Sequence, residues 1–202
     1  MLFRSVELAL IRWLGANIVY LAYFSNFVLI GSFLGIGLGF LWASRSERSL
    51  FPLAPVVLAA FVVFVTVFDV SIEVGGSELI FFADQRPVGP PRWLLLTVVF
   101  VVVAICIGCI ADGVARLFGR LTPLDAYRWD LVGSIAGVAG FSVLSFLGAA
   151  PVVWGLLAGG LFLVLLHDRS HRGLVIRVAA VGLLVGVLGI ESFGPDRAWS
   201  PY

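Results

Sequence analysis

Long apolar runs separated by short polar breaks make up most of the chain. A helix needs about 20 apolar residues to cross a hydrocarbon layer of about 30 Å. The breaks contain Pro, Gly and charged residues, which are typical of turns. The pattern predicts an all-α fold, a polytopic transmembrane helical bundle with about six membrane helices. The predicted spans are Ile18 to Trp42, Leu53 to Val70, Trp93 to Leu117, Leu131 to Leu147, Pro151 to Leu166 and Leu174 to Ile190.

Two segments at the ends of the bundle are open to more than one interpretation. Glu7 to Asn17 precedes the first run and contains Glu7 and Arg12, whose spacing of five is too wide for a strong ion pair on one helix face. The segment is either an interfacial lead-in to the first span or part of a helix whose polar end is buried in the bundle. The last run has only thirteen uncharged residues between Arg177 and Glu191, so it is either a short span or a re-entrant or interfacial helix.

Composition strengthens the membrane assignment and excludes other classes. Hydrophobic residues make up 61% of the chain and charged residues 12%, with a mean hydropathy of +1.10, whereas soluble domains are about 25% charged. This excludes a soluble domain and makes the lipid bilayer the expected partner. The net charge is only +1, so no nucleic-acid partner is expected.

The arginines predict the orientation. Arg residues gather on the cytoplasmic side of membrane proteins, and one set of loops contains most of them. The loop 71–92 on the other side has only Arg86 and Arg92, and its Gly and Pro content predicts an ordered hairpin or a short excursion. The predicted inner set is Arg45, Arg48, Arg116, Arg120, Arg128, Arg169, Arg172 and Arg177.

Glycines at four-residue intervals predict close helix packing, because small residues let two backbones approach. The alternative, that residues 35–39 form a nucleotide-binding loop, lacks a preceding strand and a following acidic residue. We therefore expect a glycine-mediated contact involving the first and fourth spans, and the same faces could join two copies of the chain. The glycines are Gly31, Gly35 and Gly39 in the first run and Gly133 and Gly137 in the fourth.

Ionisable groups near the spans are the candidate functional residues, since charge in a membrane is costly. Asp112 and Arg116 have the i,i+4 spacing of an ion pair; they form either a structural pair near the inner interface or part of a solute path. Asp130 is expected in the first turn of the fourth span, where the helix dipole favours a carboxylate, with Tyr127 in an interfacial aromatic belt. Asp69 and Glu191 are expected at the interface.

No cluster of residues predicts catalysis or metal binding. Cys106 and Cys109 lie three apart in an apolar run, which favours packing over a disulfide or zinc site. His167 and His171 have helical spacing, but no third ligand is near them. We therefore assign no catalytic, cofactor-binding or metal residue in this chain.

Several segments follow one another in an order that is characteristic of a known family. They are Glu7, Arg12 and Gly15 followed by GSFLGIGLG at 31–39, AYRWDLVGS at 126–134, Phe141 to Trp154, and WSPY at 199–202. In this order they resemble the membrane region of membrane-integrated spermidine synthase-like proteins. Residues 126–134 are similar to that region's Tyr-x-x-Asp-x-x-Gly signature, and residues 199–202 are similar to the Trp-Ser-Pro-Tyr with which the aminopropyltransferase domain begins.

The resemblance implies a transmembrane domain over residues 1–194 and, at 195–202, the start of a C-terminal catalytic domain. That domain would have a Rossmann-like fold, bind decarboxylated S-adenosylmethionine and transfer its aminopropyl group to putrescine. Its cofactor loop has no counterpart in the 202 residues, so the chain alone is expected to be inert. Residues 1–5 are expected to be non-native, because a common sequencing-adapter string encodes Leu2 to Ser5.

By this resemblance the chain is the non-catalytic membrane domain that tethers or regulates an aminopropyltransferase, in a bacterial cytoplasmic membrane. Two alternatives stay open from the residues alone. One is a small-solute transporter whose path uses Asp112 and Asp130. The other is a structural subunit of a membrane complex that packs through its glycine faces.

Overall fold

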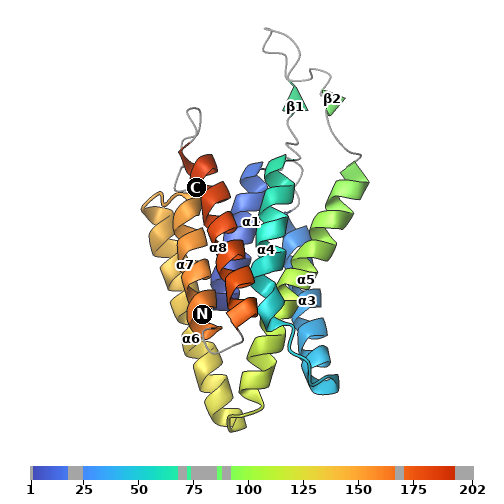
Figure 1. The fold of residues 1–202 in the computed structure, drawn as a ribbon, viewed down its shortest axis with the longest axis vertical. Helices are drawn as coiled ribbons and strands as arrows, with labels where there is room; N and C mark the ends of the chain where they lie inside the picture. The colour runs from blue at the N-terminus through green and yellow to red at the C-terminus, as the bar shows by residue number, and fades with distance from the viewer. Residues whose placement is uncertain are drawn as a thin grey trace.

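The chain forms a bundle of helices that run alternately up and down along one axis (Figure 1). The computed structural model describes residues 2–17, 25–67, 72–73, 86–87, 92–166 and 171–193. A 3-10 turn, η1 (Phe51–Leu53), leads into α4. The described α-helices are α1 (Leu2–Asn17), α3 (Ser25–Arg45), α4 (Ala54–Val67), α5 (Arg92–Phe118), α6 (Pro123–Phe146), α7 (Pro151–Leu165) and α8 (His171–Ser192).

The predicted helical class is confirmed, and the number of spans is supported only in part. Four described helices, α3, α5, α6 and α8, are long and apolar enough to cross a membrane. The helical segments Phe51–Val67 and Pro151–Leu165 are shorter. The last run forms a helix of 22 residues, long enough to cross.

Two short strands pair between α4 and α5, in the loop where the sequence predicted an ordered hairpin or a short excursion; residues 74–85 and 88–91 of that loop lie outside the described residues. Strand β1 (Ile72–Glu73) pairs with β2 (Arg86–Pro87) in antiparallel register, with Ile72 opposite Pro87. Figure 1 shows the pair beyond the upper ends of α4 and α5. Asp69 lies outside the described residues.

Helix α6 begins eight residues before the predicted Leu131, which corrects the position of Asp130. Thr122 is the N-cap, its side chain accepts a hydrogen bond from the backbone N–H of Asp125 at 3.3 Å, and Pro123 opens the helix. A Thr cap followed by Pro favours a helix start. The Thr side chain accepts a hydrogen bond from one of the unpaired backbone N–H groups of the first turn, and Pro has no N–H that needs a partner. Asp125 therefore occupies the first turn, and Asp130 lies further along the helix.

The glycine face of α3 packs against α5. A Cβ on Gly35 or Gly39 would overlap the backbone oxygen of Ala104 or of Gly108, and a Cβ on Gly31 would lie 3.2 Å from the Phe100 carbonyl oxygen. The prediction of close glycine packing is thus confirmed for the first span. Its partner is the third predicted span and not the fourth, because Gly108 on α5 supplies a complementary small residue.

The glycines of the fourth span lie on a different contact. Gly137 is buried in α6, Gly133 is half-buried, and Gly140 has open space around it. Helix α6 packs mainly on α1. The fourth span is otherwise largely exposed, with 6% of its apolar window buried.

Helix α1 belongs to the core, which settles the two interpretations of Glu7 to Asn17. Leu14 is fully buried, and Leu10, Trp13 and Glu7 are each less than 9% exposed. Glu7 is therefore buried in the bundle, as the second interpretation predicted. No ion pair links Glu7 to Arg12 among the described contacts, as their spacing predicted.

The described arginines are distributed unequally between the two ends of the bundle. The β-strand end has Arg86 and Arg92. The opposite end, called here the Arg-rich end, includes the start of α1, the end of α3, the α5–α6 turn and the start of α8 (Figure 1). Its residues are Arg4, Arg45, Arg48, Arg116, Arg120, Arg128, Arg172 and Arg177.

Candidate functional site

At the Arg-rich end, a buried carboxylate joins α5 to the loop between α3 and η1. The side chain of Asp112 is fully buried and forms an ion pair with Arg116, with 2.9 Å between Nε and Oδ1. Its other oxygen accepts hydrogen bonds from the Ser49 hydroxyl at 3.0 Å and from the backbone N–H of Leu50 at 2.7 Å. Both carboxylate oxygens therefore have partners.

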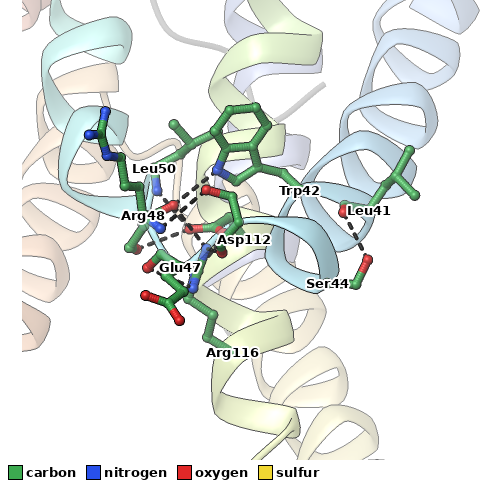
Figure 2. Close-up of polar contacts among 10 residues, drawn as sticks. Leu41, Trp42, Ser44, Glu47, Arg48, Leu50, Asp112 and Arg116 are labelled. Atoms are coloured by element: carbon green, nitrogen blue, oxygen red, sulfur yellow. Dashed lines mark hydrogen bonds and ion pairs between the residues drawn. The ribbon is translucent and has the colours of Figure 1, made fainter.

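Arg116 completes this joint by donating to carbonyl groups of the loop, as Figure 2 shows. Its Nη2 lies 2.7 Å from the carbonyl oxygen of Ser46 and 2.9 Å from that of Arg48, and its Nη1 lies 3.2 Å from that of Glu47. The ring nitrogen of Trp42 also donates to the Arg48 carbonyl, at 2.9 Å. The pair predicted from the i,i+4 spacing is present, and its geometry fixes a loop.

A second buried carboxylate joins α8 to α1 near the other end. Glu191 accepts hydrogen bonds from the Trp13 ring nitrogen and from the Asn17 side-chain amide, each at 2.9 Å. Ser192 accepts a bond from the backbone N–H of Val152 at 3.1 Å, which adds α7 to the joint. Glu191 lies at the end of α8, where α1 covers it and leaves it 7% exposed; its position at the membrane interface stays a prediction. The local sequence around Glu191 has no signal for partners so distant in the chain.

Glu7 is the least satisfied of the buried charges. Its Oε2 pairs with Arg4 at 3.0 Å, while its buried Oε1 has no hydrogen-bond partner among the described residues. Buried polar atoms are rarely left unpaired. The pair reaches the surface through Arg4, whose side chain is 40% exposed.

An open pocket of about 620 Å³ lies at the Arg-rich end, between α3, α5, α6 and α7. Its volume is in the range of small-molecule sites. It brings together two of the predicted candidates, Arg116 and Asp130, with Arg4, Arg120 and Trp129. Tyr127 does not line it and is exposed. Asp112 does not line it either, but it contacts two residues that do, Arg116 and Ser49.

The described residues do not form a metal centre. They contain no group of three or more His, Cys, Asp or Glu residues that could hold a metal ion; His167 and the side chain of His171 lie outside them. Cys106 and Cys109 are buried and free, in agreement with a packing role. The pocket at the Arg-rich end can offer a binding surface that is partly charged and partly apolar.

Comparisons with known proteins identify no relative of this chain. No family model, no curated protein and no solved structure matches it.

Proposed function

We propose that this chain is the membrane-embedded domain of a spermidine synthase-like aminopropyltransferase, where it tethers or regulates the catalytic domain. The order of the motifs at 31–39, 126–134 and 199–202 supports this family. In this arrangement the chain contributes membrane attachment and orientation, and the chemistry belongs to a domain that follows residue 202.

One observation about the geometry supports an anchoring role most directly. The buried carboxylates of Asp112 and Glu191 are both occupied in joining elements far apart in sequence. A solute path needs polar groups that exchange partners with the solute, whereas these groups hold the α3–η1 loop on α5 and hold α1 on α8. Rigid joints of this kind suit a domain that holds another domain in place.

The proposal includes an orientation. The Arg-rich end faces the cytoplasm by the positive-inside rule, so the β-strand hairpin and the end of α8 face the opposite side. A catalytic domain that follows α8 would then lie outside the cytoplasm, although both substrates of an aminopropyltransferase are made inside. The arginine distribution is the stronger argument, because it comes from this chain.

A small-solute transporter is the second candidate, and the pocket at the Arg-rich end favours it. Asp130 is exposed there and forms no hydrogen bond or ion pair with described residues. A transporter would carry a solute across the membrane of vesicles that contain the purified chain, and Asp130→Asn would lower the rate of that flux. If the chain is an anchoring domain, neither the wild type nor the Asp130→Asn variant would produce a flux.

The reading frame downstream of residue 202 in the source DNA tests the proposed function. We expect it to encode a glycine-rich cofactor loop followed by an acidic residue. Membranes containing the extended protein should form a thioether product from putrescine and decarboxylated S-adenosylmethionine, while membranes containing residues 1–202 should match a boiled control. Turnover by residues 1–202 alone, or an unrelated downstream domain, would contradict the proposal.

A further inference from the structure

The pocket at the Arg-rich end is amphipathic. Phe40 and Phe118 form part of its apolar wall, in an edge-to-face contact with ring centroids 6.2 Å apart. Leu117 and Leu165, also on the wall, are 56% and 58% exposed. The rim contains charged groups and the indole of Trp129, a residue type that gathers at the level of lipid headgroups. One molecule with a polar head and an apolar tail would satisfy both parts.

The ion pairs of the lining residues leave two charges available, one of each sign. Arg4 pairs with Glu7, and Arg116 pairs with the buried Asp112. Arg120 and Asp130 both line the pocket and are exposed, and neither side chain has a hydrogen bond or ion pair with another described residue. The pocket therefore presents a guanidinium and a carboxylate that do not neutralise each other.

We propose that this pocket binds one zwitterionic phospholipid with a primary ammonium headgroup, of the phosphatidylethanolamine type. Arg120 donates to the phosphate, because a guanidinium matches phosphate geometry. Asp130 accepts from the ammonium group, and the apolar wall takes the upper part of an acyl chain. Basic pockets between membrane helices on the cytoplasmic side bind the phosphate groups of cardiolipin and phosphoinositides; here the carboxylate of Asp130 adds a partner for an ammonium group.

The presence of both charges selects among lipids. Phosphatidylcholine has the same phosphate, but its quaternary nitrogen has no N–H to donate to Asp130. Phosphatidylglycerol has a net negative charge that the carboxylate of Asp130 repels. Free phosphoethanolamine has both charged groups but lacks the chain that the apolar wall would cover.

Native mass spectrometry of the purified chain in detergent tests the assignment, with equal amounts of the three lipids carrying identical dioleoyl chains. We expect phosphatidylethanolamine to be retained about fivefold more than phosphatidylcholine, the size of effect that a single exposed charge pair can produce. Arg120→Gln should lower retention of all three lipids about fivefold. Asp130→Asn should lower phosphatidylethanolamine selectively and raise phosphatidylglycerol.

Arg128→Gln is the matched control. Arg128 lies on the same helix as Asp130, its side chain is 69% exposed, and it is not part of the pocket lining, so the substitution should leave lipid retention unchanged. All variants should melt at the wild-type temperature in lipid-free detergent, since the substituted side chains are exposed. Equal retention of phosphatidylethanolamine and phosphatidylcholine would overturn the assignment, and so would displacement by millimolar phosphoethanolamine. Neither result bears on the proposed aminopropyltransferase role.

Discussion

Two carboxylates near the Arg-rich end, Asp112 and Asp130, differ completely in their surroundings. Asp112 is buried and has partners on both oxygens, whereas Asp130 is exposed and has no partner among the described residues. A buried charge is costly unless it is paired, and losing one partner leaves the other uncompensated. The same residue type should therefore have opposite consequences for stability at the two positions.

Replacing Asp112 should destabilise the bundle strongly. Asp112→Ala removes the acceptor for Arg116, for the Ser49 hydroxyl and for the Leu50 N–H, and we expect a loss of about 2–4 kcal/mol. Thermal melting in detergent measures it. Asp130→Ala serves as the control and should have the melting temperature of the wild type. Equal melting temperatures of the two variants would show that the contacts of Asp112 contribute little to stability.

At the scale of elements, the contact between α3 and α5 depends on how closely two backbones approach. The positions Gly31, Gly35 and Gly39 face α5, and Gly108 of α5 faces back, with a Cβ there only 3.2 Å from the Gly35 carbonyl oxygen. Dispersion between close backbones is a main source of helix association where lipid removes the hydrophobic driving force. Gly37 is not part of this contact, because it has open space around it.

This difference gives a prediction with a control on the same helix. Gly35→Leu places a side chain against the Ala104 backbone and should cost about 3 kcal/mol, the upper part of the usual range for overpacking, because neither backbone can yield without separating the helices. Gly37→Leu should leave the melting temperature in detergent nearly unchanged. If Gly35→Leu and Gly37→Leu have the same melting temperature, the α3–α5 contact does not require a small residue at position 35.

At the scale of the whole molecule, the alternating helices collect most of the described arginines at one end (Figure 1). The distribution is unequal because each polar break that follows a downward helix contains Arg. Among the described residues the hairpin end has Arg86 and Arg92, and Arg12 of α1 bonds Ser145 near the end of α6. Insertion with the Arg-rich end in the cytoplasm agrees with the positive-inside rule. Because α8 is long enough to cross, the proposed orientation places the end of α8 on the side opposite the cytoplasm.

Cysteine labelling tests the orientation. In a background with Cys106→Ala and Cys109→Ala, a cysteine at Ser200 should react with a membrane-impermeant maleimide in intact cells. A cysteine at Ser44, exposed at the Arg-rich end, should react only after lysis. Protection of position 200 in intact cells would refute the outward assignment. Labelling of position 44 in intact cells would show that the bundle has the opposite orientation.

The sequence alone determined the features that depend on neighbours a few residues apart. Run lengths predicted an all-helical chain, and the i,i+4 spacing predicted the Asp112–Arg116 pair, because helix geometry relates such positions directly. A local signal was also missed: Thr122 and Pro123 mark the true start of α6, ahead of Asp130.

Only the tertiary structure decided which elements meet. The glycine periodicity of α3 predicts a close contact but does not identify α5 as the partner, since several runs contain small residues. The burial of Glu191 depends on Trp13, which precedes it by 178 residues, and the pocket at the Arg-rich end combines residues from separate helices. The physical reason is that a residue's position on its own helix follows from local geometry, whereas its burial and partners depend on how the whole set of helices packs.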